Sequence, residues 1–161
     1  MLELAEQTDR TFDADLDALV APPPGWIADP LKKSDRHAHR VWLSPTRDTA
    51  YGVIHFTLPW PVGPDMALWG FLNEMKKSEG ESKLLSKEQD KSLPGLRFVA
   101  EGGLYTVRGN MTVRGWEGWT VYAGTSRKRE VRADELEMAQ TARDHTAVGP
   151  PRGSGASAGD Q

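Results

Sequence analysis

Three histidines in the first half of the chain have a spacing that bears on chemistry. His37 and His39 are two residues apart, so both imidazole rings project from the same face if the segment is a strand. Metal sites use that geometry, and Asp35 and His55 become further ligands if the next strand brings them close. Histidines near the start of a strand are more typically surface residues, so the sequence predicts no metal site and no cofactor.

Tyr51 and His55 form a second candidate, because they share one face of a predicted strand. In a candidate pocket these side chains could act as a proton-transfer pair, as in a small-molecule-binding or hydrolytic domain. The favoured alternative is a partly buried histidine satisfied by a hydroxyl or by the backbone. The serines lack the glycine context of a nucleophile elbow, and the glycines at 102–109 do not match a phosphate-binding loop. The sequence therefore assigns no catalytic residue and favours a non-enzymatic role.

Arginine and tryptophan give the clearest indication of a binding surface. Residues 97–132 contain seven Lys or Arg against three Glu, whereas residues 1–20 contain six acids and one arginine. Guanidinium and indole groups dominate protein interfaces and also bind single-stranded nucleic acid. The net charge of −3 disfavours nucleic acid. We therefore predict a protein partner that contacts Arg108, Arg114, Trp116, Trp119, Arg127, Lys128 and Arg129.

A competing interpretation applies to the first two of these arginines. Arg108 and Arg114 lie on the non-core face of one predicted strand, where a covering helix would bring them close to acids of the same chain. Internal pairing with Glu101, with Glu117 or with the acids of the last helix is the favoured interpretation for these two arginines. The sequence leaves open whether this face meets a partner or the protein's own last helix.

The segment 97–125 is predicted to form the centre of an antiparallel sheet, because β-branched and aromatic residues are dense there. Glycines at 102–103 and at 115–118 are placed to reverse the chain, which predicts strands over 97–101, 104–114 and 119–123. In the second strand, alternation directs Tyr105, Val107, Met111 and Val113 toward the core. An alternative is that Gly109 and Asn110 form a turn that divides this strand.

Periodicity and the positions of proline and glycine predict the other elements. They are an amphipathic helix over 13–20, strands over 40–44 and 49–58, a helix over 65–79, a polar edge strand over 83–90 and a helix over 133–146. The fold class is therefore α+β, an antiparallel sheet with packed helices in an α/β/α sandwich. The predicted domains are an acidic N-terminal segment with a proline spacer (1–24), a single domain (25–148) and a disordered tail (149–161).

Composition limits the classes of function. The 161 residues are 38% hydrophobic and 27% charged, which is typical of a soluble globular protein. The absence of cysteine excludes disulfides, thiolate nucleophiles and cysteine-based metal sites. Neither an apolar stretch long enough to span a bilayer nor a secretory signal is evident, so we expect a cytoplasmic protein. Partner identity and oligomeric state are left open.

The order of the predicted elements resembles the PsbP-like family, which includes the photosystem II accessory protein PsbP, a Ran-binding nuclear import factor and bacterial proteins. The resemblance covers about residues 25–149 and rests on element order and on the segment TAYGVIHFTL, at 49–58, followed by a helix. It implies an α/β/α sandwich and a partner-binding or assembly role. It implies no particular site residue.

Overall fold

The computed structural model describes residues 10–90 and 95–149. Its helices are α2 (Pro64–Glu79) and α3 (Ala133–His145). A small sheet contains β1 (Thr11–Asp13), β2 (Ala18–Val20) and β11 (Ala147–Val148). The large sheet contains β3 (Ile27–Ala28), β4 (Lys32–Lys33), β5 (His37–Leu43), β6 (Thr49–Thr57), β7 (Ser82–Asp90), β8 (Gly95–Gly102), β9 (Tyr105–Arg114) and β10 (Glu117–Ser126).

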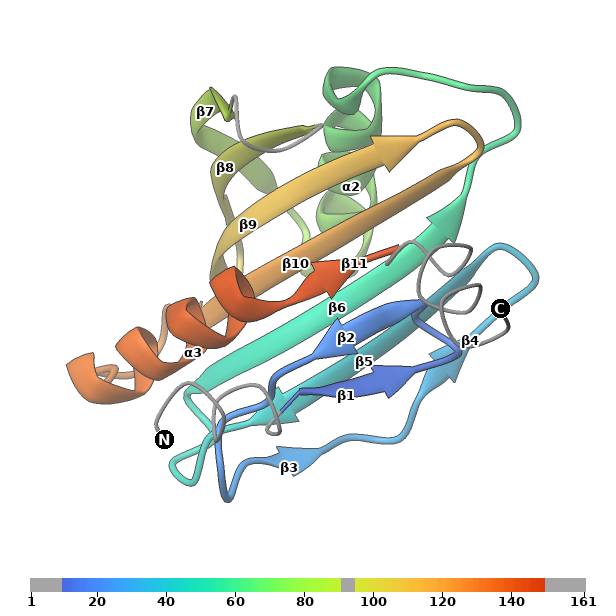
Figure 1. Ribbon diagram of the computed structural model, residues 1–161. Helices are drawn as coiled ribbons and strands as arrows, with labels where there is room; N and C mark the ends of the chain where they lie inside the picture. Colours follow the sequence, from blue (N-terminus) through green and yellow to red (C-terminus); the bar gives the residue numbers. More distant parts are fainter. Residues whose placement is uncertain (1–9, 91–94, 150–161) are drawn as a thin grey trace, which may run out of the picture.

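The large sheet has eight antiparallel strands in the order β3-β5-β6-β10-β9-β8-β7, with β4 also paired to β5 (Figure 1). The small sheet has the order β1-β2-β11 and lies beside α3. The helices pack against the large sheet, α2 on β7, β8 and β9 and α3 mainly on β10 and β6. The predicted α+β class, with an antiparallel sheet and packed helices, is confirmed.

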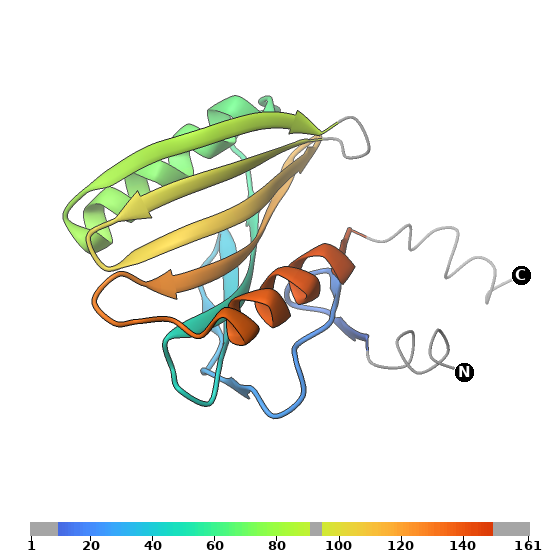
Figure 2. The ribbon, with the colours of Figure 1, turned by 90° about the vertical axis from the view of Figure 1, so that its left-hand side faces the viewer.

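The two helices cover opposite faces of the sheet. On β10, Val121 and Ala123 belong to a core that includes Ala139 and Ala142 of α3, whereas Tyr122 packs against the core formed with α2. Successive residues of a strand point to opposite faces, so β10 is enclosed on both sides. We call the two sides of the sheet the α3 face and the α2 face. Figure 2 shows that α3 lies over only part of its face, leaving β7, β8 and β9 without a helix in front of them.

Helix α2 has the ends that its sequence predicts. Pro64 occupies the first turn, where a missing N–H costs nothing, and Asp65 adds a favourable charge beside it. At the other end, Gly80 adopts φ 86° and donates its N–H to the carbonyl oxygen of Lys76. Leu68 and Met75, seven residues apart and therefore on one side of the helix, are buried against the sheet.

Strand β9 is continuous, so Gly109 and Asn110 do not form a turn. Gly109 pairs with Phe98 on β8 and with Tyr122 on β10. A Cβ atom at Gly109 would lie 2.7 Å from Cζ of Phe98, so glycine makes room for the aromatic ring in the core under α2. The predicted alternation holds for Val107 and Met111, which are buried on that face, but Tyr105, at the start of the strand, is 46% exposed instead of lying in the core.

The prediction of a helix over 13–20 is wrong. Asp13 ends β1 and its Oδ1 accepts the backbone N–H groups of Asp15 and Leu16, which stabilises a turn instead. The chain then enters β2, which pairs with β1 and with β11. The side chain of Leu16 is fully buried in the core under α3. The folded domain therefore begins before the predicted boundary at residue 24.

Residues 1–9 and the predicted tail from residue 150 onward lie outside the described residues. Within the described residues, no helix is long and apolar enough to cross a bilayer.

The N-terminal strands are predicted to contribute to global stability. Leu16→Ala removes a fully buried side chain and should lower the free energy of unfolding by about 2–5 kcal/mol. Phe12→Ala, at a side chain that is 44% exposed, should cost less than about 1 kcal/mol. Urea unfolding followed by circular dichroism measures both variants. Equal stability of Leu16→Ala and the parent protein would contradict the packing described here.

Candidate functional site

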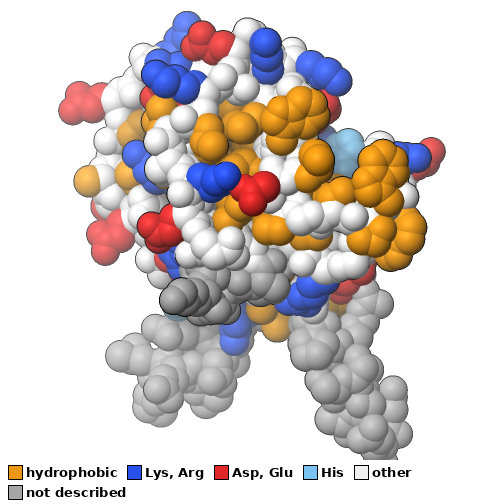
Figure 3. All heavy atoms as spheres, turned by 90° about the horizontal axis from the view of Figure 1, so that it is seen from above, with side chains coloured by type: hydrophobic (Ala, Val, Ile, Leu, Met, Phe, Trp, Pro, Cys, Tyr) orange, Lys and Arg blue, Asp and Glu red, His pale blue; other side chains and the backbone are white. Residues whose placement is uncertain are grey.

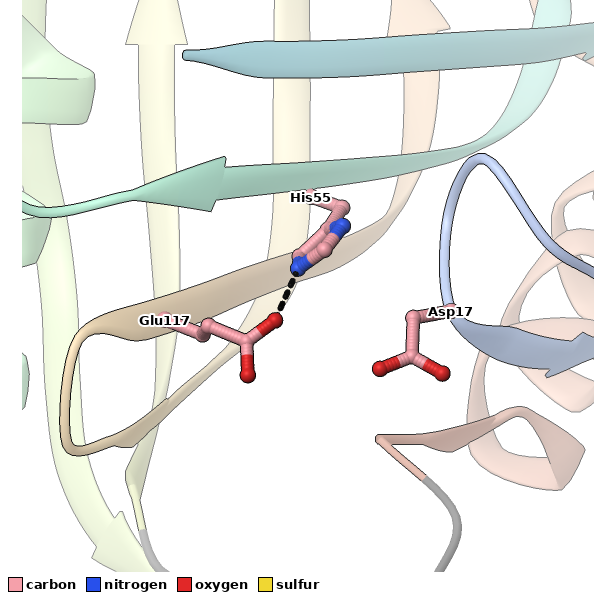
Figure 4. A group of neighbouring side chains, drawn as sticks. All are labelled: Asp17, His55 and Glu117. Atoms are coloured by element: carbon pink, nitrogen blue, oxygen red, sulfur yellow. Dashed lines mark hydrogen bonds and ion pairs between the residues drawn. The ribbon is translucent and has the colours of Figure 1, made fainter. Parts of the chain in front are cut away.

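A cluster of three titratable side chains lies at one end of the large sheet. His55 comes from β6, Glu117 from the start of β10, and Asp17 from the turn between β1 and β2. His55 Nε2 lies 2.8 Å from Glu117 Oε1, and one ligand atom from each of the three residues lies within 4.8 Å of the others. Figure 4 shows the histidine and glutamate directed toward each other, with Asp17 facing them from the neighbouring turn.

Trp119 contacts both His55 and the turn that carries Asp17. Its indole ring stacks on the His55 ring with centroids 5.0 Å apart and planes 9° apart. Its Nε1–H donates to the carbonyl oxygen of Leu16 at 2.9 Å, which fastens the turn that carries Asp17 onto the sheet. Asp17 itself adopts φ 50° and is buried. A non-glycine residue in this region is uncommon, and aspartate tolerates it better than most.

The arrangement suits the binding of a positive charge. Both ring nitrogens of His55 face oxygen acceptors: Nδ1 lies 3.4 Å from the carbonyl oxygen of Asp15, and Nε2 lies 2.8 Å from the Glu117 carboxylate. The carboxylate of Asp17 adds a second negative charge beside them. An imidazole nitrogen with two carboxylates is also a ligand set for a divalent transition metal. Asp17, His55 and Glu117 are therefore the residues that could hold such an ion.

Tyr51 and His55 do not form a proton-transfer pair, which was the less favoured of the two interpretations of these residues. The Tyr51 hydroxyl lies 2.5 Å from Thr146 Oγ1 and accepts the backbone N–H of Ala21 at 3.2 Å. Burial raises the pKa of Tyr51 to about 12. Within residues 10–90 and 95–149, His55 hydrogen-bonds only to Asp15 and Glu117. The described part of the chain therefore provides no hydroxyl nucleophile bonded to His55.

His37 and His39 share one face of β5, as predicted, but His55, on β6, points to the opposite face of the sheet. In the β5–β6 register, His39 lies opposite Ile54, and Ala38 lies opposite His55. His37 Nδ1 lies 2.6 Å from Ser34 Oγ, and His39 Nε2 lies 2.7 Å from the Tyr122 hydroxyl. The hairpin therefore places His55 and the other two histidines on opposite sides of the sheet.

The predicted partner-binding residues lie in different parts of the structure. Trp119 is only 1% exposed, so the prediction that it contacts a partner is wrong. Arg114 lies over the Trp119 ring, 5.5 Å from its centroid, and its guanidinium donates to the carbonyl oxygen of Gly149. Trp116 is 58% exposed at the tip of the β9–β10 hairpin. Arg108 lies six residues before Arg114 on β9, which separates the two arginines by roughly 20 Å.

The basic run after β10 lies at the opposite end of that strand, which is roughly 30 Å from the hairpin tip. Arg127 pairs with Glu101 at 3.4 Å and donates to the carbonyl oxygen of Gly102. Arg129 pairs with Asp48 at 3.3 Å. Lys128 is exposed. The seven predicted residues therefore do not form one surface, because three of them follow the far end of β10.

A different aromatic surface was not predicted. The backbone N–H of Leu58 donates to the carbonyl oxygen of Trp116, and the N–H of Thr57 donates to that of Arg36, both at 2.8 Å. These bonds place three segments side by side. Trp60, in the loop that leads to α2, is 63% exposed. We call Arg36, Leu58, Trp60 and Trp116 the tryptophan edge.

The prolines among residues 59–64 favour a loop, but nothing in this segment indicates that it lies beside the hairpin tip. Seen from above, hydrophobic side chains gather on the side where this loop and the tip of β9–β10 lie (Figure 3). The proximity of the two segments depends on pairing between β6 and β10, which are 60 residues apart at Thr57 and Glu117. Pairing between strands so far apart in the chain cannot be seen in local sequence patterns.

Comparison with known proteins gives no family. No protein-family model matches the chain, and no curated protein matches it. Among solved structures, the chain is similar to a protein of Bacteroides thetaiotaomicron VPI-5482 whose crystal structure was determined at 1.50 Å resolution, with 12% identity and a TM-score of 0.40. The match covers 87% of this chain and 48% of that one, so this chain spans about half its length. The site is therefore interpreted from its own geometry.

The half-buried His39 predicts a pH dependence of stability. Burial, aided by the charges of Lys32 and His37, lowers the pKa of His39 from 6.5 to about 4. Between these values the unfolded chain binds a proton that the folded protein does not, so stability is present above pH 6.5 and falls as the pH drops toward 4. The contribution at stake is about 3 kcal/mol. Urea unfolding at several pH values measures it.

His39→Gln keeps a side chain that can bond Tyr122 and should flatten this part of the pH profile. His145→Gln, at an exposed position at the end of α3, serves as the control and should retain the slope of the parent protein. An unchanged slope in His39→Gln would show that His39 does not titrate in this way.

Proposed function

We propose that the chain is a non-enzymatic interaction or assembly module that binds a protein partner through the tryptophan edge. The observation that carries the proposal is the presentation of Trp60 and Trp116, 63% and 58% exposed, on adjacent segments at one end of the sheet. Tryptophan and arginine are enriched among residues whose truncation costs most binding energy. A tryptophan side chain has only two rotatable bonds, so it loses little conformational entropy on binding.

The charge around the edge defines the partner's chemistry. Arg36 is exposed, and its guanidinium makes no ion pair with the residues that the structure describes. Arg114 is also exposed and lies two residues before Trp116. A partner segment with apolar side chains for the indoles and carboxylates for the guanidinium groups complements this surface. The partner is therefore an acidic segment with large apolar residues.

The arrangement of elements also supports the proposal. The order of the elements resembles that of the PsbP-like family. A strand pair is followed by a helix, by further antiparallel strands and by a last helix on the opposite face of the sheet. We propose that the chain is of this kind, whose members are mostly partner-binding or assembly proteins. The alternative of a hydrolytic domain near His55 has less support, because Tyr51 is buried and bonded elsewhere.

Selection from a library of displayed random peptides tests the proposed function. Selected peptides should be enriched in acidic and large apolar residues, and a synthetic copy should bind with an affinity that falls with salt. Trp60→Ala and Trp116→Ala should each weaken binding by about tenfold or more, and Arg36→Gln by a smaller factor, as measured by calorimetry.

Ile27→Ala is the matched control, because Ile27 is 74% exposed and pairs with Leu43, at the end of β5 far from His37. This variant should bind the peptide as the parent protein does. The proposal is contradicted if selection yields no enriched peptide, or if the two tryptophan variants bind as tightly as Ile27→Ala.

A further inference from the structure

The cluster of Asp17, His55 and Glu117 is assembled from segments that only strand pairing brings together. In the β6–β10 register, Trp119 lies opposite His55, and Glu117, two residues before Trp119, lies opposite Thr57. Paired residues and residues two apart on a strand share a face, so His55 and Glu117 project to the same side of the sheet. The turn between β1 and β2 then places Asp17 opposite both of them (Figure 4). The cluster therefore joins the N-terminal turn to two central strands.

The distances within the cluster are close to those that a first-row metal ion requires. Bonds of about 2.0–2.2 Å from zinc to imidazole nitrogen and carboxylate oxygen place neighbouring ligand atoms about 3.0–3.5 Å apart. His55 Nε2 and Glu117 Oε1 are 2.8 Å apart, and one ligand atom from each of the three residues lies within 4.8 Å of the others. Small rotations of the two carboxylate side chains are therefore enough for all three residues to reach one ion.

His55 has the surroundings of a histidine that ligates a metal. Such a histidine usually donates the proton of its other ring nitrogen to a backbone carbonyl or a carboxylate, which fixes the orientation of the ring. Here Nδ1 faces the carbonyl oxygen of Asp15, 3.4 Å away. The indole of Trp119 stacks on the ring with the two planes 9° apart. A proton on Nδ1 leaves the lone pair of Nε2 directed toward the carboxylates.

The cluster is sheltered and yet can be reached from solvent. The side chain of Glu117 is 44% exposed and that of His55 is 17% exposed, whereas Asp17 is buried. An ion can therefore enter past Glu117 and meet Asp17 on the inner side. The two carboxylates carry two negative charges, so a divalent ion and a neutral imidazole complete a set with no net charge. Water molecules supply further ligands on the exposed side.

We propose that Asp17, His55 and Glu117 form a binding site for a divalent transition-metal ion of the zinc type. The imidazole favours Zn²⁺ over Mg²⁺ and Ca²⁺, which are bound mainly by oxygen. The ion connects the β1–β2 turn to β6 and β10, so its binding stabilises the folded protein. The site uses no side chain of the tryptophan edge, so it does not depend on the proposed protein partner.

Calorimetry with zinc chloride and NMR of the full chain test the proposal. One Zn²⁺ should bind at micromolar concentration, and Mg²⁺ should bind at least about a hundredfold more weakly. The chain contains four histidines, whose ring signals report where the ion binds. The signals of His55 and of the Trp119 indole N–H should shift, whereas those of His37 and His145 should not.

Conservative variants separate ligation from structure. Asp17→Asn keeps a residue type that tolerates the φ of 50° at this position, and Glu117→Gln keeps a side chain that can bond His55. Each should weaken Zn²⁺ binding by about tenfold or more, and His55→Gln should abolish it. Two control variants, His37→Gln and Glu130→Gln, change exposed residues outside the cluster and should bind Zn²⁺ as the parent protein does.

Stability provides a second readout. Zn²⁺ should raise the urea midpoint of the parent protein and of His37→Gln, but not that of His55→Gln. The proposal is overturned if the parent protein binds no Zn²⁺ at micromolar concentration, or if the His37 signals shift in place of those of His55. Equal affinity of Asp17→Asn, Glu117→Gln and Glu130→Gln would overturn it as well. The NMR experiment uses the parent protein, so the test does not depend on whether a variant folds.

Discussion

The structure depends on the enclosure of strand β10 by two helices that cover different parts of opposite faces. Ala123 and Val121 are buried under α3, and Trp119 is buried on the same face by the turn that contains Leu16. On the other face, Tyr122 packs against the core under α2. Because each helix is too narrow to cover seven or eight strands spaced about 4.8 Å apart, part of each face stays uncovered. The candidate sites lie at the limits of this coverage.

The partial coverage of the sheet by the two helices explains why residues of one strand have such different surroundings. Along β9, the side chains that face α2 form a core, whereas Arg108 and Asn110 point to the α3 face beyond the edge of α3. Arg114 points to that face as well, but it lies over Trp119 and is bonded to Gly149. Three polar residues of the same strand face thus differ in their contacts, because Arg114 is bonded to Gly149, whereas Arg108 and Asn110 lie farther along the strand.

Most strands of the large sheet and both helices could be predicted from the sequence, because the alternation and the 3.6-residue periodicity of apolar residues are local properties. The first two strands were missed because Phe12, Leu16, Leu19 and Val20 also fit a helical stripe, and the pairing of Leu19 with Ala147 is not visible locally. The burial of Trp119 could not be predicted for the same reason, since the turn at Leu16 is 103 residues away. His55 was identified as a candidate, but its contact with Glu117 required the β6–β10 register.

The central claim, that α3 covers only part of its face, can be measured by thiol labelling, because the chain contains no cysteine. Val99, Arg108 and Ala123 lie in one row across β8, β9 and β10, so Val99→Cys and Ala123→Cys place thiols on the same face. Ala123 is fully buried under α3, whereas Val99 is half-buried. The account predicts that Val99→Cys reacts with a small disulfide reagent at least about a hundredfold faster than Ala123→Cys under native conditions. Equal protection of the two thiols would show that the whole face is covered and would contradict the account.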